Sequence, residues 1–267
     1  MSARRFTPLA LIRRRRRATL AAAFLLVLLL TATSAFALRI VAGPVVVNAE
    51  GSFSPRALPK HENAPIILRG GGSVSTLSGA LPPILHTITI DFDRHGSVQT
   101  TGLEVCTSAK LEATTTAAAR HNCPGAIVGE GEGTATIAFP ESQPFNLSSP
   151  ITIFNGPRIH GDDTVIAHAY LASPVATTFI VPIVIERIHD GVYGYRTKGT
   201  IPTIAGGSGI PISGHLRIGR QWTYRGHHYS YVNARCETGH LQAKGEFEFK
   251  DGTFLAGSFV KACKVRG

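Results

Sequence analysis

The chain has 267 residues, and its 27 Lys and Arg outnumber its 17 Asp and Glu, which gives a formal net charge of +10. Seven arginines lie within residues 1–37, which contain no acidic residue, so the remaining chain carries only +3. A charge of +3 without a basic run excludes nucleic acid as an expected partner, and it excludes a polybasic membrane contact.

The first 37 residues have the layout of a secretory signal peptide. Five arginines at 13–17 precede an uncharged, leucine-rich run, and Ala35-Phe36-Ala37 supplies the small-residue cleavage step. We expect cleavage near Ala37 and a protein that is secreted or lies on the extracellular face of the cell envelope. An uncleaved signal anchor is the alternative, since residues 18–38 carry no charge and could span a bilayer. Membrane contact is expected only through such an uncleaved segment.

Residues 38–60 predict a linker or a loosely packed arm. They contain Pro44, Gly51, Pro55 and Pro59, and only 45–47 reads as a strand.

Residues 61–267 predict an all-β domain. Residues 87–93 and 245–250 alternate apolar and polar side chains, as strands with one buried face do. Asp190-Gly191, Arg225-Gly226 and Asp251-Gly252 predict tight turns between strands. We expect a two-sheet β-sandwich of the jelly-roll or immunoglobulin-like kind. His86 precedes Cys106 by 20 residues, and His215 precedes Cys236 by 21. This similarity leaves open a duplication, in which the domain would consist of two packed halves split near residue 156.

One segment departs from the β pattern. Residues 109–120 are alanine-rich, with Ser108 available as the N-cap, and they predict one short helix. Cysteines flank it at positions 106 and 123, and two more stand at 236 and 263. An even number in an exported chain predicts two disulfides. Of three possible pairings we favour Cys106–Cys123 and Cys236–Cys263, because each pair encloses one compact unit.

Two groups of side chains could bind a metal, and both have a simpler interpretation. His160, Asp162 and His168 offer the ligands of a hydrolytic zinc, whereas a polar turn followed by a strand histidine explains them equally. Asp91 and Asp93 share one strand face and could bind calcium, or form a solvated face beside a turn. No cofactor is expected, with zinc or calcium as the alternative.

The 221–231 segment is the most aromatic of the chain. A turn at Arg225-Gly226 would bring its rings together on a hairpin, where they could stack on a sugar or another apolar ligand. The same rings could instead fill the core. The candidate ligand-binding side chains are Trp222, Tyr224, His227, Tyr229 and Tyr231.

Several short segments together resemble a set of functionally uncharacterised secreted proteins of high-GC actinobacteria. The resemblance covers most of residues 58–266 and implies a bacterial exported protein, without an activity or a catalytic residue. It is carried by the four cysteines and by Leu58-Pro59-Lys60-His61, Pro65-Ile66, Thr89-Ile90-Asp91-Phe92-Asp93-Arg94, Phe154-Asn155-Gly156 and Ala167-His168-Ala169-Tyr170.

Motifs of common hydrolases and nucleotide-binding enzymes are missing. The sequence has no G-x-S-x-G elbow, no H-E-x-x-H and no phosphate-binding glycine loop. We therefore expect a non-catalytic secreted or cell-surface protein that binds an envelope component, a glycan or another protein. The alternative is a metal-assisted extracellular hydrolase that uses the His and Asp cluster.

Overall fold

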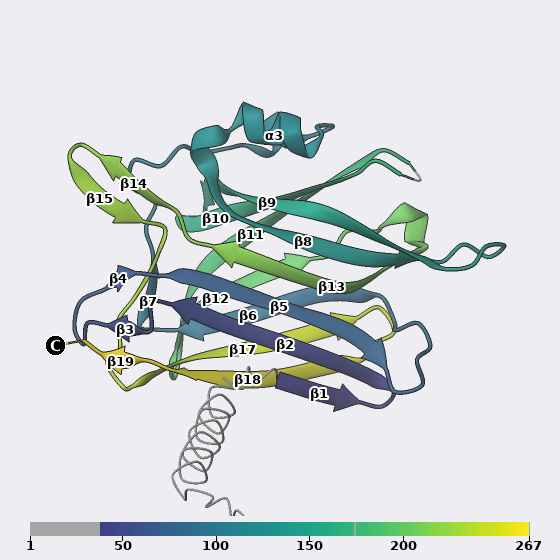
Figure 1. The fold of residues 1–267 in the computed structure, drawn as a ribbon, viewed down its shortest axis with the longest axis horizontal. Helices are drawn as coiled ribbons and strands as arrows, with labels where there is room; N and C mark the ends of the chain where they lie inside the picture. Colours follow the sequence, from purple (N-terminus) through teal and green to yellow (C-terminus); the bar gives the residue numbers. More distant parts are fainter. Residues whose placement is uncertain (1–37, 174, 267) are drawn as a thin grey trace, which may run out of the picture. The chain divides into compact units, whose positions relative to one another are not determined.

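Twelve antiparallel strands form one continuous sheet (Figure 1). Their order across the sheet is β1 (Leu38–Ala42), β2 (Val45–Ser54), β5 (Ile67–Thr76), β13 (Gly209–Ile218), β8 (Ile127–Ile137), β9 (Phe145–Ile159), β10 (Asp162–Leu171), β11 (Thr177–Asp190), β12 (Tyr193–Thr200), β6 (Leu85–Asp93), β17 (His240–Phe249) and β18 (Phe254–Ala262). This computed structural model describes residues 38–173 and 175–266. The chain divides into two units, Met1–Phe36 and Ala37–Gly267, and the described residues belong to the second.

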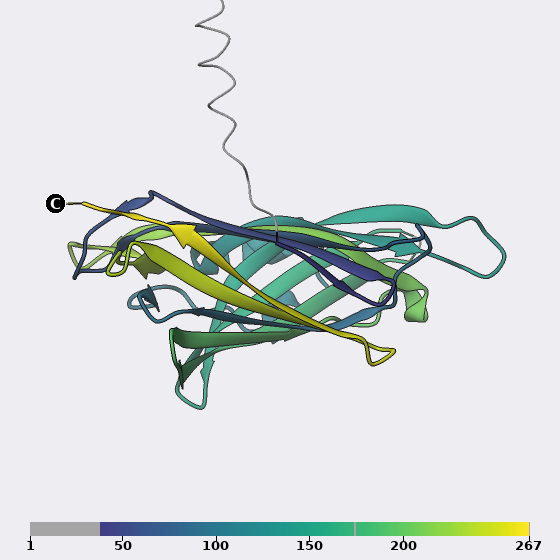
Figure 2. The same ribbon diagram turned by 90° about the horizontal axis from the view of Figure 1, so that it is seen from below.

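The sheet curves until its two edge strands, β1 and β18, lie beside each other (Figure 2). They meet through side chains, because β1 is paired only with β2 and β18 only with β17. Leu38 and Ile40 of β1 pack against β18 at Gly257, and Phe259 packs against Gly51 of β2. The result is a nearly closed, barrel-like sheet.

Period-two alternation fills the inside of this sheet with apolar side chains. Val45, Val47 and Val74 from β2 and β5 pack with Leu85 of β6 and Phe249 of β17. A second inner cluster joins β8 to β11 and contains Val128, Ile153, Val165, Ile185 and Tyr231. Burial of both clusters removes apolar surface from water, which is the main force that holds the curved sheet together.

The all-β prediction is confirmed, but the main body is one nearly closed, barrel-like sheet of twelve strands where two packed sheets of a sandwich were expected. A sandwich was expected because alternating runs and turns look the same in both architectures. Here β9, β10 and β11 continue the ladder of hydrogen bonds around the curve, so one sheet supplies both facing layers. β9 runs through residue 156, where two packed halves could have been divided.

Residues 38–54 form β1 and β2 of the large sheet and 57–58 form β3 of a small one, contrary to the expected linker or loose arm over 38–60. Val45, Val47 and Phe53 of this segment are almost fully buried. Val45 and Val47 are buried against β5, β6 and β17, and Phe53 is buried beside the Cys236–Cys263 disulfide. This burial explains why strands form in a stretch rich in proline and glycine.

Two short helices pack on the outer face of the sheet where one was expected. They are α2 (Ser108–Leu111) and α3 (Thr116–Asn122), and a one-turn 3₁₀ helix, η1 (Pro124–Ala126), follows. The break falls at Ala113, whose φ of 53° ends the first helix, and Thr115 caps the second by accepting a hydrogen bond from Ala118 N. The Cys106–Cys123 disulfide forms as predicted and encloses both helices.

The remaining strands gather at one end of the large sheet (Figure 1). The predicted pairing of Cys236 with Cys263 is confirmed there, and both sulfurs are buried beside Phe53 and Leu58. Two disulfides indicate an oxidising, extracellular environment. The small sheets are β14 (Gln221–Tyr224) with β15 (His227–Ser230), β4 (Ala64–Pro65) with β16 (Val232–Ala234) and β7 (Gly96–Val98), and β3 (Ala57–Leu58) with β19 (Lys264–Val265); η2 (Ala205–Gly207) precedes β13.

Within residues 38–173 and 175–266, no helix combines the length and the apolar character that crossing a membrane requires. The expected signal peptide or anchor, residues 1–37, lies outside the described residues.

Candidate functional site

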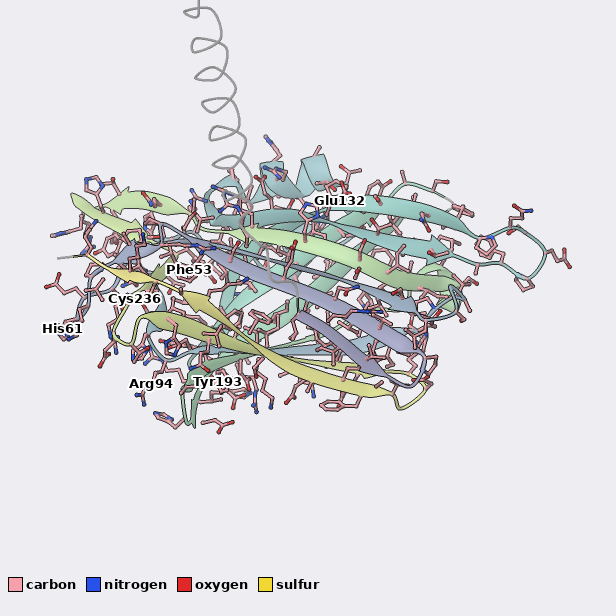
Figure 3. The ribbon with its side chains drawn as sticks, turned by 60° about the horizontal axis from the view of Figure 1, so that its bottom comes forward. Phe53, His61, Arg94, Glu132, Tyr193 and Cys236 are labelled. Carbon is pink, nitrogen blue, oxygen red and sulfur yellow. A yellow bond between two sulfur atoms is a disulfide. The ribbon has the colours of Figure 1, made fainter. Side chains whose placement is uncertain are left out.

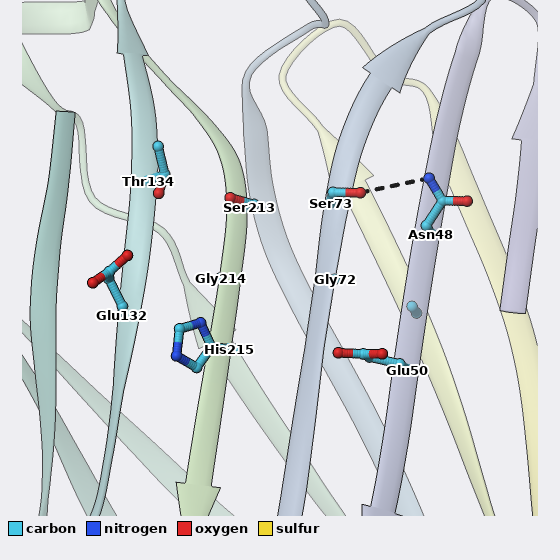
Figure 4. A pocket seen from close by; sticks show the side chains of 10 residues that line it. Asn48, Glu50, Gly72, Ser73, Glu132, Thr134, Ser213, Gly214 and His215 are labelled. Carbon is cyan, nitrogen blue, oxygen red and sulfur yellow. Dashed lines mark hydrogen bonds between the residues drawn. The ribbon is translucent and has the colours of Figure 1, made fainter. Parts of the chain in front are cut away.

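A hollow of about 340 Å³ lies on the outer face of the sheet, across β2, β5, β13 and β8 (Figure 4). Its lining is polar and comes from four stretches of sequence. The lining residues are Asn48, Ala49, Glu50, Gly72, Ser73, Glu132, Thr134, Ser213, Gly214 and His215.

Strand register explains why these polar side chains stand in rows. Asn48 pairs with Ser73, Ser73 with Ser213, and Ser213 with Thr134, so four polar side chains cross the sheet on one face. Directly paired residues of antiparallel strands share a face, and neighbouring strands lie about 4.8 Å apart. The row therefore offers a hydroxyl or amide group at every strand.

A glycine makes the hollow in the next row. Glu50 pairs with Gly71, Gly71 with His215, and His215 with Glu132. A Cβ on Gly71 would lie 2.9 Å from the carbonyl oxygen of Gly214 and 3.2 Å from the Cβ of His215, so the position has no room for a side chain. The missing side chain leaves open space between Glu50 and His215.

Two carboxylates flank this space without a partner. Glu50 and Glu132 are exposed, and neither forms a hydrogen bond or an ion pair with any described residue. His215 is exposed between them, as Figure 4 shows. A ligand that entered the hollow would meet two free acceptors and an imidazole without displacing an existing contact.

None of these lining residues is among the functional candidates predicted from the sequence. The signal was present in Gly70-Gly71-Gly72-Ser73, because glycines within a strand mark a close approach of backbones or a binding surface. However, nothing in the sequence indicated that 48–50, 132–134 and 213–215 would lie beside it.

The zinc candidates do not come together. His160 lies in the exposed turn between β9 and β10, and Asp162 begins β10. His168 stands six residues further along the strand, roughly 20 Å away at the rise of an extended chain. It is fully buried, and its Nε2 lies 3.1 Å from the hydroxyl of Thr114.

Asp91 and Asp93 are buried and already satisfied. Arg196 donates two hydrogen bonds to Asp91, at 2.7 and 2.8 Å, and this contact raises the pKa of the guanidinium. Asp93 accepts hydrogen bonds from the backbone nitrogens of His95 and Gln242. Calcium would have to displace these donors. Across the described part of the chain, no three His, Cys, Asp or Glu side chains form a group that could hold a metal ion.

The aromatic hairpin forms as expected, with β14 and β15 joined at Arg225-Gly226. The ring of Trp222 stacks on Tyr229 at 5.8 Å, and its indole nitrogen donates to the carbonyl oxygen of Thr101. These half-buried rings therefore pack within the hairpin and hold the segment that precedes α2.

The other aromatic candidates divide between surface and core. Tyr224 is half-buried with its ring over Gly102, and His227 is exposed. Tyr231 is 2% exposed and belongs to the inner core, where burial raises the pKa of its phenol. This placement makes the 221–231 segment mainly a packing element.

Burial of His168 predicts that stability depends on pH. Desolvation lowers the pKa of His168 below its ordinary value of 6.5, against the opposing effect of its hydrogen bond to Thr114. Below about pH 6.5 the unfolded chain therefore binds a proton at His168 that the folded chain does not bind. The contribution of His168 to the free energy of unfolding should be constant above about pH 7 and should fall as the pH drops below about 6.5. Urea unfolding at pH 7.5 and pH 5 checks this, and the decrease should be smaller in His168→Gln. An equal decrease in both proteins would contradict the assignment.

No protein-family model, no curated protein and no solved structure matches this chain.

Proposed function

We propose that this protein is an exported, non-catalytic binding protein that holds an envelope glycan in the outer hollow of β2, β5, β13 and β8. The observation that carries the proposal is the pair of unpartnered carboxylates, Glu50 and Glu132, at the two sides of a row of polar side chains. The two disulfides and the signal-like N-terminal sequence support a place outside the cell.

The chemistry of the lining favours a ligand rich in hydroxyl and amino groups. Asn48, Ser73, Ser213 and Thr134 both donate and accept hydrogen bonds, as sugar hydroxyls do. The two carboxylates only accept, and they bind most strongly to a charged donor such as the ammonium group of an amino sugar. An extended glycan could contact the row at successive strands.

Binding without hydrolysis is favoured by the spacing of the carboxylates. Three strand spacings separate Glu50 from Glu132, so their backbones lie about 14 Å apart. Glycosidases place their two carboxyl groups about 5 to 9.5 Å apart on either side of the scissile bond, and the Glu50 and Glu132 side chains would have to lean toward each other, across His215, to reach that separation. In the hollow the imidazole of His215 stands between the two acids (Figure 4).

Calorimetric titration with a soluble glucosamine oligomer tests this proposal, with the neutral glucose oligomer of the same linkage as comparison. We expect the amino-sugar oligomer to bind more tightly. Glu50→Gln and Glu132→Gln should each weaken binding about tenfold, because loss of a charge-assisted hydrogen bond removes about 1.5 kcal/mol.

Glu248→Gln is the matched control. Glu248 is an exposed acid on β17, away from the hollow, so its substitution changes the net charge equally without touching the site. Absence of binding by both oligomers, or an equal loss in Glu248→Gln, would contradict the proposal.

A further inference from the structure

A second cavity, of about 400 Å³, lies at one end of the sheet beside the turn that joins β11 to β12. It is separate from the outer hollow and shares no residue with it. Figure 3 shows two of its residues, Arg94 and Tyr193, at this end of the molecule. Its lining consists of Arg94, Arg187, Ile188, His189, Gly191, Tyr193, Gly194 and Tyr195.

Two register shifts, on the two sides of β12, lie beside this cavity. The β11–β12 ladder shifts register between Arg187 and Asp190, and the β12–β6 ladder shifts between Tyr193 and Tyr195. Such bulges bend a strand and change the direction of its side chains, and they are common beside binding sites. A Cβ on Gly194 would lie 2.8 Å from the Cα of Arg94, so a glycine is needed for Arg94 to cross β12 here.

The cavity collects positive charge. Two guanidinium groups and one imidazole line it, and none of its lining residues is acidic. Arg187 lies over the ring of Tyr195, 5.6 Å from its centroid, and this contact leaves its charge uncompensated. The side chain of Arg94 forms no hydrogen bond or direct ion pair with a described residue, and Glu237, whose pKa its charge helps to lower, does not line the cavity.

Three other arginines, in contrast, form ion pairs with carboxylates. Arg196 is paired with Asp91, Arg235 with Glu237, and Arg158 with Asp163. Asp190 is in the same turn, but it does not line the cavity and forms no ion pair with a described residue. Because Arg94 and Arg187 line the cavity and no acid does, an anion in the cavity would be attracted by both guanidinium groups.

We propose that this cavity binds the oxyanion of a phosphate- or sulfate-bearing ligand. Guanidinium groups present paired donors that match the oxygens of such a group, and Arg94 and Arg187 approach it from different strands. The cavity is larger than one oxyanion, and the rings of Tyr193 and Tyr195 form walls against which an attached sugar or other organic group can pack.

Calorimetric titration of the secreted protein with inorganic phosphate and with a hexose 6-phosphate tests this proposal. We expect binding that weakens as salt is added, because the interaction is electrostatic and partly exposed. Arg94→Gln and Arg187→Gln should each weaken it about tenfold, the effect of one lost charge-assisted hydrogen bond. Both arginines are exposed, so these variants should fold normally, which circular dichroism verifies.

Arg217→Gln is the control, since Arg217 is an exposed arginine on β13 outside this cavity. Unchanged binding in Arg217→Gln, with losses in the other two variants, supports the site. Equal affinity for the two probes assigns the site to a free oxyanion, and tighter binding of the sugar phosphate assigns it to an esterified one. Failure of both probes to bind, or an equal loss in all three variants, overturns the proposal. Support or failure of this proposal leaves the proposed glycan binding untouched, because the outer hollow shares no residue with this cavity.

Discussion

Phe154→Ala is expected to destabilise the protein by about 4 kcal/mol, a large part of the stability of a typical domain. Phe154 has no exposed surface, although it lies on the outer side of β9. It fills the space between the sheet and the short helices, packing with Leu111, Ala119 and Ile166. Its ring also meets the imidazole of His168 edge to face, with centroids 6.4 Å apart. Truncation to alanine would leave a cavity in this second core.

Phe145→Ala provides the matched comparison for this prediction. Phe145 begins the same strand and is 42% exposed, so its removal should change the free energy of unfolding by at most about 0.5 kcal/mol. Chemical unfolding of both variants gives the two values. Similar losses, or a small loss in Phe154→Ala, would show that the helices do not pack on β9 as described.

Removal of the Cys106–Cys123 disulfide by the double substitution Cys106→Ser and Cys123→Ser should cost about 3 kcal/mol. The bridge spans 17 positions, and the chain-entropy model assigns about this value to a loop of that size. α2 and α3 have four and seven residues, too few to be stable as isolated helices. Without the bridge, the segment between the two positions should open more often than the rest of the protein.

Trypsin cleavage measures this local opening, since Lys110 and Arg120 lie between the two cysteines. We expect the double variant to be cut first at these two sites. The corresponding Cys236→Ser and Cys263→Ser variant is the control: it loses a bridge of similar size without faster cleavage at Lys110. Equal cleavage rates at Lys110 in the two double variants would contradict the role of the first bridge.

Local signals predicted the features whose cause is local. Asp190-Gly191, Arg225-Gly226 and Asp251-Gly252 form the expected turns, because their positive-φ glycines suit tight reversals whatever surrounds them. The nearest-neighbour cysteine pairings were predictable for a similar reason, since each pair closes a short loop. The helical segment at 109–120 was predicted at the right place, but its division into two helices at Ala113 was not predicted.

Features that depend on distant parts of the chain were not predictable. The partner of Asp91 is Arg196, 105 residues away, so the aspartate looked like a free ligand in the sequence. His168 resembled a metal ligand in the sequence, but in the fold its Nε2 contacts Thr114, in the loop between the two short helices. The outer hollow needs four strands whose sequence positions range from 48 to 215.

The sequence by itself therefore determined an all-β chain with two disulfides, tight glycine turns and a helical insertion. The tertiary structure alone decided that one sheet curves until its edge strands meet, that 38–54 belongs to it, and that two polar cavities lie on it. The physical reason is that a period of two tells which side chains share a face. Which face is buried, and which strand lies alongside, depend on contacts between residues far apart in the chain.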